Sequence, residues 1–106
     1  MNLLFVDEEN TWAQTGAKVY RLFKHSTESF GIFVHSYIDE KEVNQHMGWA
    51  DFAICFSQKV AQALCHMRVY WKKVIIVPFE YKYSKDDSWL IKLFLETPLL
   101  KQFRTE

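Results

Sequence analysis

The sequence opens with a short apolar run, Leu3-Leu4-Phe5-Val6, which stands directly before an acidic triplet, Asp7-Glu8-Glu9. Two further runs, residues 52–56 and 74–77, are also continuously apolar. Runs without polar alternation are typical of strands that are covered on both faces of a sheet. The more mixed stretch 31–35 suits a strand at the edge of the same sheet. The sequence therefore predicts four strands.

Segments with helical periodicity and capping signals lie between these runs. Small residues on one face of the first segment, among them Gly16 and Ala17, allow a helix to approach a sheet closely. Capping boxes or single caps mark where the helices begin, and a glycine or a proline marks where two of them end. The predicted helices run from Thr11-x-x-Gln14 to Lys24, from Asp39-x-x-Glu42 to a C-cap at Gly48, onward from Ser57, and from residues 84–88 to Thr97-Pro98.

Alternating strands and helices predict an α/β fold. The connections are too long for hairpins, so right-handed crossovers and a four-stranded parallel sheet are expected, as a three-layer sandwich with helices on both faces. The length of 106 residues fits one domain spanning residues 1–106. Ligands of such sheets bind beyond the carboxyl ends of the strands, so the functional site is expected there.

Composition excludes several classes of function. Thirteen basic and thirteen acidic residues give zero formal net charge, which argues against nucleic acid and anionic membrane as partners. Lys72 and Lys73 beside two aromatic rings are too few for a nucleic-acid site and suit a solvated turn. The longest apolar run is far too short to span a bilayer, and a cytoplasmic protein is expected. Cys55 and Cys65 are expected to be reduced core residues, and neither metal nor cofactor is expected.

Five segments carry a family resemblance when they are taken in order: Leu4-Phe5-Val6-x-x-x-Asn10, Trp49-Ala50-Asp51, Val74-Ile75-Ile76-Val77-Pro78, Tyr81-x-Tyr83 and Leu90-Ile91-x-Leu93. Their order and spacing resemble the short bacterial branch of the low-molecular-weight protein tyrosine phosphatases. The resemblance covers nearly the whole chain and implies the phosphatase-like α/β fold. In that family, the loop after the first strand holds a cysteine nucleophile and, six residues later, an arginine. Its amides cradle the phosphoryl group.

The chemistry-bearing positions of that loop are replaced in this chain. The resemblance places Asp7 at the position of the nucleophile and Ala13 at that of the arginine, while Asn10 matches the asparagine that shapes the turn. Gln14 stands where the family has a serine that assists the thiolate. Glu80 is the only carboxylate near the position of the general acid. Tyrosine phosphatase chemistry is therefore not expected.

Charge argues against phosphate binding at the same loop. Two like unit charges about 4 Å apart repel by about 4 kcal/mol at an effective dielectric constant near 20. The acidic triplet places such charges where the phosphoryl group would lie, and the missing arginine removes a bidentate clamp.

A catalytically inactive domain that binds a protein or small molecule is the function that these features favour. Its acidic and aromatic edge at the strand carboxyl ends suits a cationic or aromatic group, by charge pairing and cation–π contact. The degenerate phosphate-loop positions are Asp7, Glu8, Glu9, Asn10, Trp12 and Ala13, and the expected pocket rim is Phe79, Glu80, Tyr81 and Tyr83.

Other interpretations remain open for the acidic triplet. One is a Mg²⁺-dependent phosphomonoester hydrolase with Asp7 as nucleophile and Ser57 and Asp86-Asp87 as companions. A second is a structural homodimer whose pocket is filled in. The simplest is electrostatic, since carboxylates before a helix N-terminus are stabilised by about 0.3–1 kcal/mol.

Overall fold

Strands and helices alternate along the chain, as the apolar runs and the capping signals predict. The computed structural model describes residues 1–8, 10, 12–32, 39–64, 73–77 and 87–104. Its strands are β1 (Asn2–Asp7), β2 (Ser26–Gly31), β3 (Phe52–Cys55) and β4 (Val74–Ile76), and its helices are α1 (Trp12–Arg21), α2 (Glu40–Trp49), α3 (Gln58–Leu64) and α4 (Asp87–Glu96), followed by a 3₁₀ helix (Pro98–Arg104).

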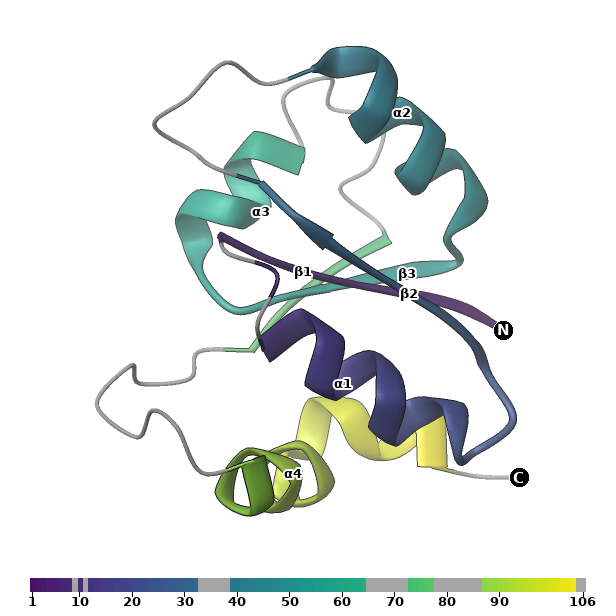
Figure 1. Cartoon of the computed structure of the whole chain (residues 1–106), viewed down its shortest axis with the longest axis vertical. Coiled ribbons are helices and arrows are strands. Elements are labelled where there is room, and N and C mark those ends of the chain that lie inside the picture. Colours follow the sequence, from purple (N-terminus) through teal and green to yellow (C-terminus); the bar gives the residue numbers. More distant parts are fainter. Residues whose placement is uncertain (9, 11, 33–38, 65–72, 78–86, 105–106) are drawn as a thin grey trace.

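The four strands form one parallel sheet in the order β2-β1-β3-β4. At its centre, Leu4 of β1 lies opposite Glu28 of β2 and Ala53 of β3. Helices α2 and α3 cover one face, and α1, α4 and the 3₁₀ helix cover the other (Figure 1). The predicted α/β class, with a four-stranded parallel sheet between two helical layers, is confirmed.

Alternation along β1 divides the core between the two faces. Leu3 and Phe5 pack in the cluster under α1 and α4, whereas Leu4 and Val6 pack in the cluster under α2 and α3. All four side chains are fully buried. This two-sided burial is the physical reason why β1 is continuously apolar instead of alternating.

Small residues let α1 lie close to the sheet, as its sequence predicts. Ala13, Gly16 and Ala17 are buried against the core, and the ring of Tyr20 stacks on Phe5 with 5.5 Å between centroids. The Tyr20 hydroxyl donates a hydrogen bond to the Phe94 carbonyl oxygen over 3.1 Å. This contact ties α1 to α4 beneath the sheet.

The edge strand lies earlier in the chain than the predicted stretch 31–35. The structure places β2 at Ser26–Gly31, while residues 33–35 lie outside the described part of the chain. The Ser26 N–H donates to the Met1 carbonyl and the Ile32 N–H to the Asp7 carbonyl, so backbone pairing fixes the strand. An edge strand that is half-exposed needs no continuous apolar run, and for that reason its sequence carries no such signal.

The ends of the helices follow the predicted signals in part. Ser57 caps α3, because its hydroxyl oxygen accepts a hydrogen bond from the Val60 N–H. Helix α4 ends before Pro98 as predicted, and Leu100 and Phe103 of the following 3₁₀ helix are buried in the core. The glycine C-cap expected at Gly48 is wrong, because α2 continues to Trp49. No helix in the described ranges is long and apolar enough to cross a bilayer.

A lysine from another part of the chain caps the C-terminus of α2 instead. The Lys73 ammonium, just before β4, donates hydrogen bonds to the carbonyl oxygens of Met47 and Ala50 over 3.1 and 3.0 Å. Terminal carbonyls of a helix carry partial negative charge, so a cation is favoured there. Lys73 is therefore a structural residue, and the solvated turn predicted for it is wrong.

Replacing Lys73 by methionine is expected to lower the free energy of unfolding by about 0.5–1.5 kcal/mol, because the stem is kept while both hydrogen bonds are lost. Urea unfolding followed by far-UV circular dichroism measures this change. Lys101→Met is the matched control, since Lys101 is exposed and its replacement is expected to change stability by less than about 0.5 kcal/mol. Equal midpoints for the two variants would contradict the capping role.

Candidate functional site

The turn between β1 and α1, residues 7–13, is the first candidate site because it corresponds to the predicted phosphate loop. Its first residue, Asp7, is the last residue of β1 and is only 5% exposed. Among the described residues it is the only buried charged or polar one. A buried carboxylate requires strong partners, and the turn provides them.

Two backbone N–H groups at the start of α1 bind the carboxylate of Asp7. Its Oδ2 atom accepts hydrogen bonds from the N–H of Trp12 over 2.7 Å and from the N–H of Ala13 over 3.1 Å. These are N–H groups that a helix cannot satisfy internally. Asp7 therefore caps α1 and occupies the donors that would otherwise point at a bound anion.

The backbone of the turn is shaped at Asn10. Its φ angle is 55°, in the left-handed region that asparagine tolerates better than most residues. Its side-chain oxygen is buried and accepts no hydrogen bond within the described part of the chain. The resemblance assigns Asn10 the shaping of this turn, and its backbone conformation agrees with that role. Glu8 is half-buried, whereas Glu9 and Thr11 lie outside the described residues.

Apolar side chains close the helix side of the turn. Ala13, at the position that the resemblance gives to an arginine, is fully buried in the core cluster under α1. The Trp12 ring packs edge-on against Phe56, just after β3, with 6.0 Å between centroids. The structure thus brings Asp7, Trp12 and Ala13 together next to the end of β3. The predicted rim, Phe79, Glu80, Tyr81 and Tyr83, lies outside the described residues.

The residues that the hydrolase hypothesis pairs with Asp7 are not seen beside it in the described part of the chain. The hydroxyl of Ser57 caps α3, Asp86 lies outside the described residues, and Asp87 is the first residue of α4. In the ranges that the structure describes, no three His, Cys, Asp or Glu side chains are grouped so that they could hold a metal ion. Cys55 is fully buried in β3, as expected of a core residue, while Cys65 is not described.

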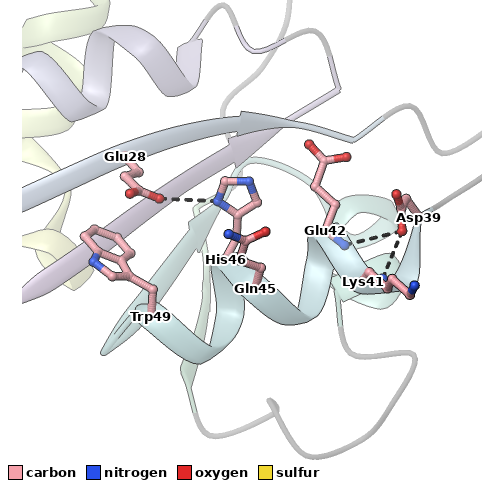
Figure 2. A pocket seen from close by; sticks show the side chains of 7 residues that line it. All are labelled: Glu28, Asp39, Lys41, Glu42, Gln45, His46 and Trp49. Atoms are coloured by element: carbon pink, nitrogen blue, oxygen red, sulfur yellow. Dashed lines mark hydrogen bonds and ion pairs between the residues drawn. The ribbon is translucent and has the colours of Figure 1, made fainter.

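A second candidate site lies between α2 and the edge strand β2. This α2–β2 groove has a volume of about 620 Å³. His46 anchors it, because its ring stacks on Phe30 with 4.5 Å between centroids and its Nδ1 lies 3.3 Å from Oε2 of Glu28 (Figure 2). The residues that line the groove are Glu28, Asp39, Lys41, Glu42, Gln45, His46 and Trp49.

The sequence contains a signal for this groove. Glu42, Gln45, His46 and Trp49 follow one another at the helical spacing i, i+3, i+4 and i+7, so they share one face of α2. The face is polar and aromatic, so it lacks the apolar pattern that marks the buried face of a helix. Its partner on the sheet, Glu28, becomes recognisable only when β2 is placed correctly.

Comparisons with known proteins leave the family open. A scan against protein-family models, a search of curated proteins and a search of solved structures each give no match. The likeness to the low-molecular-weight tyrosine phosphatases stays a prediction from the sequence segments, and function has to be argued from the geometry of the two sites.

Proposed function

We propose that this chain is a catalytically inactive relative of the low-molecular-weight protein tyrosine phosphatases. In this proposal it acts as a binding or interaction module through the acidic and aromatic edge at the strand carboxyl ends. The observation that carries the proposal is the position of Asp7, whose carboxylate holds the Trp12 and Ala13 N–H groups at the start of α1.

Electrostatics at this helix end supports the lack of phosphatase chemistry. The N-terminus of a helix carries roughly half a positive charge, which Asp7 already offsets from inside the protein. A phosphoryl group would have to displace this carboxylate or lie beside it, and a contact at about 4 Å costs about 4 kcal/mol at an effective dielectric constant near 20. The methyl group of Ala13 is buried in the core and offers no compensating positive charge.

The same edge is suited to a positively charged or aromatic group. Glu8 is half-buried beside the turn, and the Trp12 ring is half-buried against Phe56. Carboxylates attract cations through Coulomb interactions, and aromatic rings attract them through cation–π interactions. Amine, guanidinium or aromatic groups are therefore the ligand chemistry that this edge favours.

The first test is an assay of the protein on p-nitrophenyl phosphate, with and without Mg²⁺. No turnover above the rate in buffer is expected, because the turn has no thiolate and Asp7 occupies the Trp12 and Ala13 N–H groups. The Asp7→Asn variant serves as a control for chemistry at this residue. Turnover that requires Mg²⁺ and disappears in this variant would establish the hydrolase hypothesis in place of the proposal.

The second test compares ligands by thermal unfolding at constant ionic strength, since a ligand of the folded state raises the midpoint. Arginine and tetramethylammonium are expected to raise it, whereas inorganic phosphate and phosphotyrosine are not. The Glu8→Gln variant is expected to weaken the response to cations, and Glu96→Gln, on the exposed surface of α4, is expected to keep it. Stronger stabilisation by phosphate than by the cations would overturn the proposal.

A further inference from the structure

Strand β2 leaves one side of its backbone open along the α2–β2 groove. It is the first strand of the sheet and pairs only with β1 in the described chain. The Ser26 and Ile32 N–H groups point to β1. Because N–H directions alternate along a strand, the backbone groups of Thr27, Ser29 and Gly31 point away from the sheet. Among the described residues, these outward groups form no backbone–backbone hydrogen bond.

No described element covers this open side. Figure 1 looks along the sheet from the β2 edge, and α2 runs beside β2 without crossing in front of it. An extended segment placed there would continue the sheet while its side chains on one face reach the groove and α2. Strand addition of this kind obtains affinity from backbone hydrogen bonds and specificity from alternate side chains.

The groove has more acidic than basic side chains, which favours basic side chains in such a segment. Three carboxylates, from Glu28, Asp39 and Glu42, line it against a single lysine, Lys41. The Glu28 side chain is 44% exposed, so it is accessible from solvent even with His46 beside it. Trp49 adds an aromatic surface at the C-terminal end of the groove-lining face of α2 (Figure 2). This combination of carboxylates and an indole ring suits lysine or arginine.

We propose that the α2–β2 groove binds an extended basic peptide segment of a partner protein, which adds to the sheet as a strand beside β2. Its lysine or arginine side chains, at alternate positions, lie against Glu28, Glu42 and Trp49. The site is separate from the β1–α1 turn, so it does not depend on the function proposed for that turn.

Charge also disfavours a second copy of this chain as the occupant. Pairing two β2 strands around a two-fold axis would join two identical acidic grooves on the same side of the extended sheet. The carboxylates of Glu28 and Glu42 would then face their own copies, and like charges across an interface are unfavourable. A basic segment meets no such repulsion.

The test is an NMR titration of the ¹⁵N-labelled full chain with an octapeptide of alternating lysine and valine. Shifts are expected at the amides of Thr27, Ser29 and Gly31 and at the Trp49 indole N–H, whereas an octapeptide with glutamate in place of lysine is expected to cause none. Peptides N-methylated on the lysines or on the valines separate strand addition from simple charge attraction. Only one of these two peptides is expected to lose binding, namely the one whose N-methyl groups replace the N–H groups that face β2.

Charge reversal provides the matched variants. Glu28→Lys combined with Glu42→Lys is expected to weaken binding of the lysine peptide by about tenfold or more, and Glu96→Lys, on the exposed surface of α4, is expected to leave it unchanged. Comparison of amide spectra without peptide verifies that each variant folds. Equal binding of the two N-methylated peptides, or shifts confined to residues outside β2 and α2, would overturn the proposal. So would a concentration-dependent dimer paired through β2.

Discussion

Replacing Gly16 by alanine is expected to lower the free energy of unfolding by about 1–3 kcal/mol, as overpacked cores do. A Cβ atom at this position would lie 2.5 Å from Cδ1 of Phe5 and 2.9 Å from Cζ of Phe94. Both rings are fully buried, so neither can move aside without disturbing its own neighbours. The backbone of α1 therefore approaches the sheet as closely as it does only because residue 16 has no side chain.

The other described helical glycine gives a control with the opposite sign. An added Cβ at Gly48 in α2 would meet nothing within 4 Å, and its φ angle is not positive. Gly48→Ala is thus expected to raise the stability by up to about 0.5 kcal/mol, which is less than the gain in a helix interior because Gly48 lies in the last turn of α2. Chemical denaturation of both variants measures the two changes.

The contact with Phe5 can be tested separately through a double-mutant cycle. In a Phe5→Leu background the ring atoms nearest to residue 16 are absent, so Gly16→Ala is expected to cost less than it does alone. If the changes in unfolding free energy of the two substitutions were fully additive, the close contact between Gly16 and Phe5 would be wrong. A Gly16→Ala variant as stable as Gly48→Ala would contradict the same contact.

Replacing Asp7 by alanine is expected to lower the free energy of unfolding by about 1–3 kcal/mol. The substitution leaves the Trp12 and Ala13 N–H groups without their carboxylate acceptor in a partly buried turn, and unsatisfied buried donors cost this much. Asp7→Asn is expected to cost less, because the amide oxygen can still accept while the negative charge is lost.

The matched control is the exposed cap of α2. Asp39 accepts hydrogen bonds from the N–H groups of Lys41 and Glu42 at the surface, and its replacement by alanine is expected to cost about 1 kcal/mol. Urea unfolding of the three variants should therefore rank Asp7→Ala as the least stable. If Asp39→Ala were the more damaging change, the structural role assigned to Asp7 would be wrong.

Strands β1, β3 and β4 could be predicted from the sequence because packing on both faces of the sheet leaves a local mark. Residues 3–6, 52–56 and 74–77 are continuous apolar runs, and each contributes to a strand between two helical layers. The small residues of α1 and the cap at Ser57 are equally local signals. Each of these features depends on residue types within one turn or one strand.

Features that depend on distant partners could not be predicted in the same way. Strand β2 is defined by its pairing with β1, not by apolar residues. Lys73 lies 26 and 23 positions after Met47 and Ala50, the two residues whose carbonyl oxygens it binds. The α2–β2 groove combines both difficulties, because its helix stripe is polar and its strand was expected five residues later. The sequence did indicate that acidic residues favour the start of α1, and the structure identifies Asp7 as the carboxylate that binds there.

The most direct test of the central claim is a titration of the ¹⁵N-labelled protein with inorganic phosphate at constant ionic strength, observed at the amides of Trp12 and Ala13. In the wild-type protein neither resonance is expected to move, because Asp7 holds both N–H groups. In the Asp7→Ala variant both are expected to respond more strongly than in the wild type. Wild-type resonances that shift and saturate with phosphate would contradict the claim that this turn excludes an anionic ligand.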